Sequence, residues 1–338
     1  MKHDDAGPLP PWLAPLTVPA SWGYGVVAWA HRAWDARRPA AHAGVRTISV
    51  GNVTVGGTGK TPFVRWCAGE LAAAGHRPAI ALRGYRAHDG ASDEADEYRD
   101  LLPGVPLAVG GDRSASIARM RAANPQVDCV VLDDGFQHRR LARDLDIVLV
   151  DATRPGLGGR LLPAGWLREW PGVMRRADHV VITRARDVDE PALAALVEAM
   201  HGRPPIAWTR YDWTGLRVAC EGEARNEPVE WLRGRSAVVA AAIGNPAAFL
   251  AQCRASGVRV HATEIRADHA AYDRVTVARI AALARAAPEP VVVLTGKDWV
   301  KAREHAAEHP GVRWAVPVVG LRFLAGEQPL RSAVVAAG

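Results

Sequence analysis

The sequence predicts an α/β protein: a P-loop NTPase-like parallel sheet domain with a second, smaller α/β domain. Three observations lead to this prediction. After residue 45, short runs rich in valine and isoleucine alternate with longer mixed stretches. The short runs are apolar almost throughout, as in parallel strands that helices cover on both faces. A glycine-rich loop that ends in Lys60 and Thr61 follows the first strong run and opens a helix.

The elements of the first domain follow one another along the chain. We expect strands at 47–50, 79–82, 107–109, 127–132, 146–150 and 179–183. We expect helices between them at 60–74, 93–102, 113–123 and 190–200. Each helix is long enough to cross back over the sheet, so successive strands are expected to be parallel.

A change of rhythm marks the second domain. The polar, tryptophan-containing stretch 203–235 indicates a connector or hairpin. A second set of strands and helices follows it: strands at 237–243, 258–263, 290–294 and 314–319, and helices at 246–255, 272–286 and 299–305. We therefore expect a P-loop kinase domain at 1–205, with an N-terminal membrane-associating helix. A smaller α/β domain at 206–338 is expected to be joined to it by a hairpin-like linker.

Composition sets the broad class. The chain has 338 residues, of which 49% are hydrophobic and 23% are charged, the balance of a globular protein. A formal charge of +6 makes phosphates and anionic headgroups plausible partners, although arginine supplies nearly all of it. The four cysteines form no CxxC pair, which favours free thiols in a reducing compartment. The start is not a secretory signal, and no apolar run reaches about 18 residues, so we expect a cytoplasmic protein.

The first 38 residues are unusually rich in tryptophan. Trp22, Val26 and Trp29 share one helical face, Tyr24, Val27 and Trp34 widen the apolar surface, and Arg37 and Arg38 follow. A helix of this kind suits a membrane interface, where indole rings lie at headgroup depth and cations meet anionic lipid. A helix docked on the protein's own core is the equally weighted alternative.

The glycine-rich loop predicts a phosphate-binding site. Backbone N–H groups of the loop would point at a phosphate, Lys60 would reach the β- and γ-phosphates, and the Thr61 hydroxyl would ligate magnesium. The strict pattern requires glycine at position 54, where this chain has Thr54. The related loop of deviant P-loop ATPases carries a lysine where this chain has Val55. The residues expected to bind the cofactor are Val55, Gly56, Gly57, Thr58, Gly59, Lys60 and Thr61.

Carboxylates end the run at 127–132. Asp133 and Asp134 occupy the position of the acidic residue that holds magnesium in P-loop enzymes, and ligands collect at this edge of a parallel sheet. The acidic segment 91–97 offers a carboxylate that could accept a hydroxyl proton, although such a segment is more often a solvated face. The cations that could clamp phosphate are Arg83, Arg86 and Arg113. His269 is, by itself, an ordinary loop histidine.

These motifs together resemble tetraacyldisaccharide 4′-kinase, the lipid A biosynthesis kinase of Gram-negative bacteria. The resemblance runs from about Trp12 to Leu321, and DDGFQH with LPAG and LRE is its most specific part. The matching segments are GNVTVGGTGKTP, LRGYR, SDEA, GGDR, LDDGFQHRRLARDLDIVLVD, LLPAGWLRE, ADHAAY and LTGKDWVK. The resemblance implies transfer of the ATP γ-phosphate to the 4′-hydroxyl of tetraacyldisaccharide 1-phosphate. The product would be lipid IVA, made on the cytoplasmic face of the inner membrane.

The resemblance also implies roles for single residues. Asp93 would be the proton acceptor, paired with His269, and Arg168 and Glu169 would lie near the metal and phosphates. Lys60 and Thr61 match the family's P-loop, and Asp133 and Asp134 match its DD pair; either aspartate could be the direct metal ligand. The chain departs from the family in flanking positions: Leu82 to Arg86 for SRGYG, Ser92 for the glycine of GDE, Trp166 for a proline, and Gly296 for the glutamate of TEKD.

The resulting hypothesis is an in-line transfer that uses ATP and Mg²⁺. Lys60 and the loop amides would neutralise the phosphates, with Arg113 or Arg168 offsetting charge on the transferred group. The acceptor would be a tetraacylated glucosamine disaccharide 1-phosphate at the inner-membrane surface, and no obligate protein partner is evident. The main alternative is a deviant P-loop switch ATPase that couples hydrolysis to partner binding. A non-catalytic nucleic-acid or membrane binding protein is disfavoured, because the basic residues form no stripe interleaved with aromatics and the P-loop would have no role.

Overall fold

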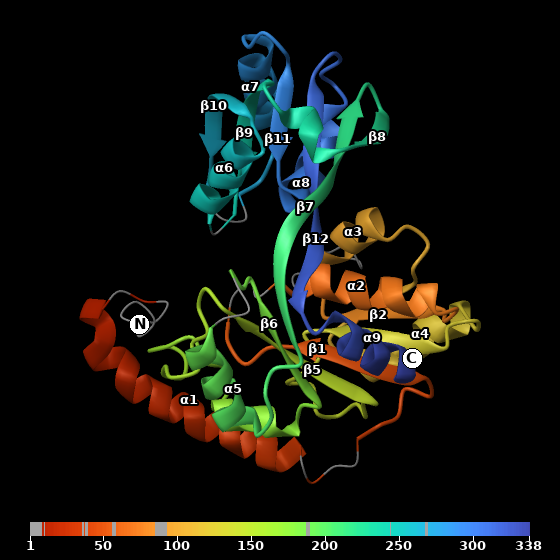
Figure 1. Cartoon of the computed structure of the whole chain (residues 1–338), viewed down its shortest axis with the longest axis vertical. Helices are drawn as coiled ribbons and strands as arrows, with labels where there is room; N and C mark the ends of the chain where they lie inside the picture. The colour runs from red at the N-terminus through yellow and green to blue at the C-terminus, as the bar shows by residue number, and fades with distance from the viewer. Residues whose placement is uncertain are drawn as a thin grey trace. The chain divides into compact units, whose positions relative to one another are not determined.

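The computed structural model describes residues 9, 11–35, 37, 40–55, 59–84, 93–186, 190–243, 245–267 and 270–338. The chain divides into two compact units (Figure 1). Unit 1 comprises Met1–Gly90, Leu101–Tyr211 and Leu321–Gly338, and unit 2 comprises Ala91–Asp100 and Asp212–Gly320. The sequence indicates a single division near residue 205. In the structure the chain passes between the units four times, and a segment near residue 95 belongs to unit 2.

A parallel sheet forms the core of unit 1. Its strands are ordered β7-β6-β5-β1-β4-β2-β3, and every neighbouring pair is parallel. The strands are β1 (Arg46–Gly51), β2 (Pro78–Leu82), β3 (Leu107–Val109), β4 (Cys129–Asp133), β5 (Leu145–Asp151), β6 (His179–Thr183) and the first part of β7 (Ala207–Cys220). The helices are α1 (Ala14–Asp35), α2 (Lys60–Ala73), α4 (Arg113–Ala123), α5 (Pro191–His201) and α9 (Glu327–Ala336). The predicted parallel sheet with crossover helices is confirmed. Strands β2, β4 and β5 are buried along their whole length, and this explains why their sequences are apolar.

Unit 2 is a smaller α/β layer. Strands β9 (Ser236–Ala241), β10 (Arg259–Ile265), β11 (Val291–Leu294) and β12 (Arg313–Ala325) are ordered β10-β9-β11-β12, and each neighbouring pair in this order is parallel. The helices are α6 (Pro246–Ala255), α7 (Arg274–Arg285) and α8 (Gly296–Ala306), with most of α3 (Asp93–Leu101). The stretch predicted as a connector or hairpin contains β7 paired antiparallel with β8 (Glu223–Glu227).

The last segment of unit 1 covers α2. Beyond the predicted end of its strand, β12 continues to Ala325, and α9 follows. Arg331 Nε of α9 lies 2.7 Å from Glu70 Oε2 of α2, and the rings of Trp66 and Phe323 lie 5.0 Å apart. Leu330 and Val334 are fully buried. This short alanine- and valine-rich helix was not foreseen, because its apolar face is explained only by the distant helix that it covers.

Helix α1 has an unusual distribution of side chains. Trp22 and Trp29 are 76% and 65% exposed, and Val26 between them is exposed as well. Thr17 and Ser21, both polar, are buried instead. The predicted apolar face therefore points to solvent in this structure. None of the described helices combines the length and the apolar character needed to cross a bilayer.

Candidate active site

The phosphate loop begins where β1 ends, at the carboxyl edge of the sheet. β1 lies between β4 and β5, with Val50 opposite Asp133 and Gly51 opposite Val148. Gly51 has no room for a side chain, because a Cβ there would lie 2.4 Å from the Cβ of Phe136. The close approach brings the loop after β1 against the loop after β4, which carries the predicted acidic residues.

Gly59 forms the entry to α2. Its φ is +81°, a left-handed conformation that glycine adopts without a steric penalty. A Cβ on Gly59 would lie 2.2 Å from the ring of Tyr211, whose hydroxyl donates a 2.8 Å hydrogen bond to the Gly59 carbonyl. Gly56, Gly57 and Thr58, which the sequence predicts to bind phosphate, lie outside the described residues.

Lys60, the first residue of α2, is held at the centre of a polar network. Its Nζ lies 3.2 Å from Asn52 Oδ1 and 3.2 Å from Asp134 Oδ1. The other oxygen of Asp134, Oδ2, lies 2.8 Å from Arg168 Nη1. One carboxylate thus bridges two cations that are more than 100 residues apart in the sequence, Lys60 and Arg168. This arrangement gathers the positive charge that a polyphosphate requires.

The Asp134 carboxylate is ionised in this setting. Burial opposes its charge, but the attraction and hydrogen bonds of Lys60 and Arg168 outweigh burial and lower its pKa. Its backbone φ is +56°, a conformation that costs a non-glycine residue free energy and is often found at functional sites. The turn aims the carboxylate at both cations.

Arg168 reaches the network through main-chain pairing. Val55 N donates to Trp166 O at 2.7 Å, and Arg168 N donates to Val53 O at 2.8 Å. Thr54 and Leu167 form an antiparallel bridge between these two bonds. The end of the LPAG-W-LRE motif is therefore paired with residues 53–55 through an isolated β-bridge, and this explains why its arginine lies beside Asp134.

The residues predicted to bind the metal all carry side-chain oxygens. Asp133 ends β4 with a buried side chain, Thr61 is half-buried in the first turn of α2, and Glu169 is 6% exposed next to Arg168. Together with Asp134, this set offers only carboxylate and hydroxyl oxygens, the ligands that Mg²⁺ prefers in phosphate-binding sites. The residues that the sequence singled out for a metal therefore fit a magnesium ion by their chemistry.

Arg113, which the sequence predicts to bind phosphate, is buried and contacts backbone carbonyls in this structure. It is 4% exposed at the first position of α4. Its Nη1 donates to Gly110 O at 2.7 Å and its Nη2 to Asp133 O at 3.3 Å. Both guanidinium nitrogens thus fix backbone at the ends of β3 and β4, so Arg113 supports the loop that carries the acidic pair.

Comparison with known proteins agrees with this geometry. The sequence pattern of the family described as tetraacyldisaccharide-1-P 4′-kinase, LpxK, matches residues 13–337. The chain belongs to this family. A tetraacyldisaccharide 4′-kinase of Geobacter metallireducens is 40% identical over 273 residues, covering 75% of this chain and 78% of the relative. One from Geobacter sulfurreducens is 37% identical over 315 residues, covering 87% and 85%.

A solved structure shares the architecture. LpxK from Aquifex aeolicus, crystallised in complex with ATP, superposes with a TM-score of 0.72 at 25% identity. The match covers 95% of this chain and 98% of that chain. The chain is therefore a kinase of the tetraacyldisaccharide 4′-kinase family on a P-loop fold, and none of these relatives supports the switch ATPase.

Two residues that the family resemblance singles out belong to unit 2. Asp93 begins α3, but its side chain lies outside the described part of the structure, as does the whole of His269. Their predicted roles as proton acceptor and partner therefore stay predictions. Asp298 of the TGKD segment is fully buried, and its Oδ2 accepts hydrogen bonds from Ala242 N at 3.2 Å and from Thr295 Oγ1 at 2.7 Å.

The sequence did not single out two polar residues at the carboxyl edge of the sheet, Asn52 and Asp151. Asn52 is fully buried, accepts from Lys60, and donates through Nδ2 to Thr54 O at 2.7 Å. Asp151 ends β5, the strand next to β1, forms an ion pair with Arg184, and accepts from Thr153 N at 2.9 Å. Asp151 carried the same signal as Asp133, an acid that ends an apolar run. The sequence around Asn52 gave no comparable signal, apart from its position directly after Gly51.

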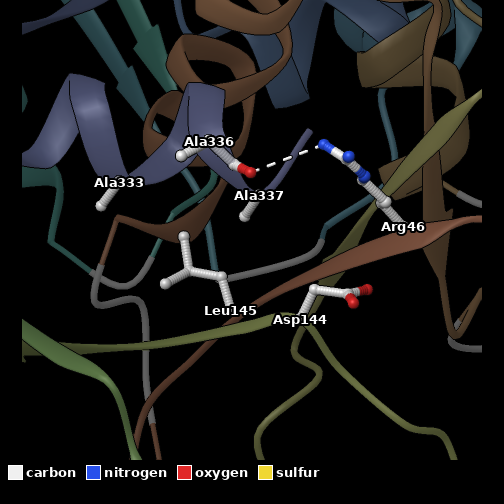
Figure 2. A pocket seen from close by; sticks show the side chains of 6 residues that line it. All are labelled: Arg46, Asp144, Leu145, Ala333, Ala336 and Ala337. Carbon is white, nitrogen blue, oxygen red and sulfur yellow. Dashed lines mark hydrogen bonds between the residues drawn. The ribbon is translucent and has the colours of Figure 1, made fainter.

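Two polar groupings lie near the opposite, amino ends of the strands. One is a depression of about 430 Å³. It is lined by Arg46, Asp144, Leu145, Ala333, Ala336 and Ala337 (Figure 2). Its polar groups serve the fold: Asp144 Oδ2 accepts from Thr47 N at 2.7 Å, and Arg46 donates to the carbonyls that end α9.

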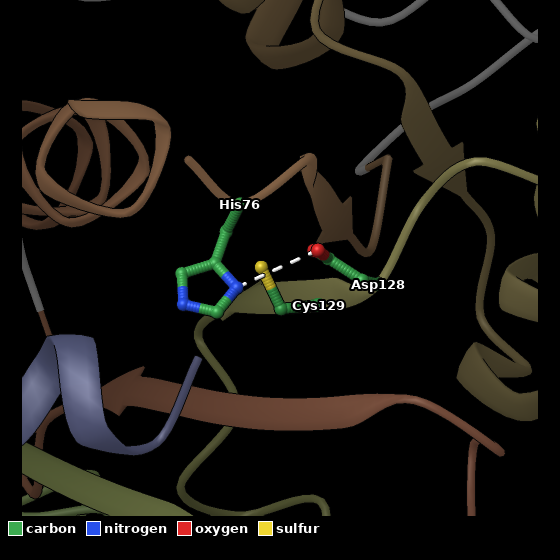
Figure 3. A group of neighbouring side chains, drawn as sticks. All are labelled: His76, Asp128 and Cys129. Atoms are coloured by element: carbon green, nitrogen blue, oxygen red, sulfur yellow. Dashed lines mark ion pairs between the residues drawn. The ribbon is translucent and has the colours of Figure 1, made fainter. Parts of the chain in front are cut away.

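Figure 3 shows the second of these groupings, His76, Asp128 and Cys129. Asp128 accepts from Arg77 N at 2.9 Å and lies 3.5 Å from His76 Nδ1. Burial, and then Asp128, raise the pKa of the Cys129 thiol to about 12. The contacts join the beginnings of β2 and β4, and they account for the cluster without a metal.

Proposed function

We propose that this chain transfers the γ-phosphate of ATP to the 4′-hydroxyl of tetraacyldisaccharide 1-phosphate and forms lipid IVA. The observation that carries the proposal is the network in which Asp134 holds Lys60 and Arg168 at the carboxyl edge of the sheet. The names of the relatives supply the acceptor. The Aquifex protein, crystallised with ATP, supports the donor.

The roles of the binding residues follow from their positions. Lys60 and the amides of the loop from Val55 to Thr61 would bind the phosphates, and Arg168 would offset charge on the transferred group. The single negative charge of Asp134 pairs with both cations and leaves one positive charge uncompensated among the three groups, so phosphates would find a net positive site. Asn52 sets the direction of the Lys60 side chain, because its own amide is fixed on Thr54 O.

Magnesium would be held by Thr61 and the Asp133 carboxylate, with Asp134 and Glu169 nearby. The ion supplies charge neutralisation of the β- and γ-phosphates when bound. Arg113 would keep Asp133 in place through its carbonyl, in addition to any action on phosphate. Asp93, supported by His269, would accept the proton of the 4′-hydroxyl, a role that rests on the family motif.

The acceptor is acylated, so the site must meet a membrane surface. The exposed apolar face of α1 suits insertion among headgroups, with Trp22 and Trp29 at interfacial depth. We place the protein at the cytoplasmic face of the inner membrane as a peripheral enzyme. Exposed tryptophans of this kind would otherwise cost solvation without any gain in packing.

A phosphotransfer assay tests this function. Purified protein is incubated with labelled ATP, magnesium and detergent-dispersed tetraacyldisaccharide 1-phosphate. We expect label on the lipid with the native chain, and a loss of several orders of magnitude in Lys60→Ala. Arg225→Ala removes an exposed cation of β8 and serves as the matched control. Label released as free phosphate without a lipid product would refute the proposal in favour of the switch ATPase.

A further inference from the structure

The most buried of the described side chains of α1 are polar, the reverse of an ordinary surface helix. Thr17 and Ser21 are 9% and 6% exposed, and Tyr24 is half-buried on the same side. Gly25 allows close packing there, because a Cβ at Gly25 would lie 3.0 Å from Leu161 Cδ1. Hydrogen bonds have narrow limits of distance and angle, so such contacts fix the position of a helix along its axis.

These polar groups bind one segment of the protein. Ser21 Oγ lies 2.9 Å from both Leu161 O and Thr17 O, which share its one proton, and it accepts from Ala164 N at 3.0 Å. Tyr24 OH donates to Arg168 O at 3.1 Å. The contacts fall at the beginning, the middle and the end of residues 161–168, and two of them use carbonyls that flank the turn.

The same segment carries the arginine of the site. Leu167 bridges to Thr54 of the phosphate loop, Arg168 N donates to Val53 O, and the Arg168 side chain pairs with Asp134. A displacement of α1 would therefore move the carbonyl of Arg168, and with it the guanidinium. Helix, segment and phosphate loop form one continuous chain of hydrogen bonds within unit 1.

We propose that Ser21 and Tyr24 are positioning residues that couple the seating of α1 on a lipid surface to the placement of Arg168. The proposal rests on the proposed function for its effect on transfer. Lipid contact on the outer face fixes α1, and its inner face then holds residues 161–168 against the phosphate loop. A lipid surface thus acts on the site and not only on the concentration of the acceptor.

The kinetic test is a double-mutant cycle. Tyr24→Phe removes only the hydroxyl, and we expect about 5-fold lower kcat on vesicle-borne acceptor, with vesicle binding unchanged. In the Arg168→Ala background the same change should have no further effect, because it acts through Arg168. Trp22→Ser, on the outer face, should weaken vesicle binding.

Hydrogen exchange gives a readout independent of transfer. We expect amides within 161–168 to gain protection when anionic vesicles are added to the native chain, and not in Ser21→Ala/Tyr24→Phe. Equal protection in both proteins, or a Tyr24→Phe effect of the same size with and without Arg168, would overturn the coupling. A native chain that gains protection but labels no lipid would instead refute the proposed function and leave the coupling standing.

Discussion

Replacing Gly59 by alanine tests how the entry to α2 is built. The native φ is +81°, and a left-handed alanine costs about 1–2 kcal/mol. The new Cβ would lie 2.2 Å from Tyr211 Cε2 and 2.4 Å from its Cζ and hydroxyl oxygen, so the ring must move. Overpacking of this kind costs about 1–3 kcal/mol. We therefore expect Gly59→Ala to lower the free energy of unfolding by about 2–5 kcal/mol.

The two contributions can be separated. Partial burial raises the pKa of the Tyr211 hydroxyl, so it stays protonated and donates to Gly59. Removing the ring in Tyr211→Ala removes the steric conflict, and a further Gly59→Ala should then cost only the backbone strain. Gly69→Ala, on the same helix with open space around it and no positive φ, is the matched control and should not destabilise.

Thermal melting and nucleotide titration are the assays. The melting temperature of Gly59→Ala should be lower than that of the native chain by on the order of 10 °C. ATP affinity should fall with it, since the residue precedes Lys60. The assigned geometry would be wrong if Gly59→Ala had the same melting temperature as the native chain. It would also be wrong if Gly59→Ala lost the same amount of stability with and without the Tyr211 ring.

Three further predictions concern the acidic pair. Asp134→Asn should lower the free energy of unfolding at neutral pH, because the pKa of the Asp134 carboxyl is lower in the folded than in the unfolded chain. The difference in free energy of unfolding between variant and native chain should shrink as pH falls below about 4. Denaturant titrations at several pH values measure it, and a constant difference would contradict the pairing with Lys60 and Arg168. Arg113→Ala should lower the melting temperature as well as turnover, because backbone at both strand ends loses its donor; unchanged melting would leave Arg113 as a phosphate clamp only. Chelation of magnesium should abolish transfer, and Asp133→Asn should raise the magnesium concentration needed to restore it; an unchanged requirement would argue against Asp133 as ligand.

The sequence predicts those parts of the fold correctly in which a local pattern determines the secondary structure. The strands at 107–109 and 179–183 and the helix at 113–123 have the predicted bounds, because apolar runs and helical stretches alternate cleanly there. The segment near residue 95 and helix α9 belong to units that their sequence neighbours do not indicate. Their placement depends on distant surfaces that no local pattern contains.

The site was predictable in part for the same reason. Lys60 and Asp134 come together because each follows a strand, and β1 and β4 are neighbours in a parallel sheet. Arg168 was expected from family resemblance, but its strand-like pairing with the phosphate loop was not. Asn52 was missed because a buried amide that accepts from a lysine leaves no periodic signal.

The division of unit 1 among three stretches of chain has a consequence for biosynthesis. Residues 212–320 leave the ribosome after β6 and before α9, so a nascent chain can complete most of unit 2 while one face of α2 still lacks its cover. Phe323 and Leu330 are synthesised after unit 2, and only then can they pack against α2, where Phe323 contacts Trp66. Until they arrive, an apolar surface next to the nucleotide loop is open to chaperones and to aggregation. Translation arrest within the final 20 or so codons would thus yield a chain whose phosphate-binding half is unfinished.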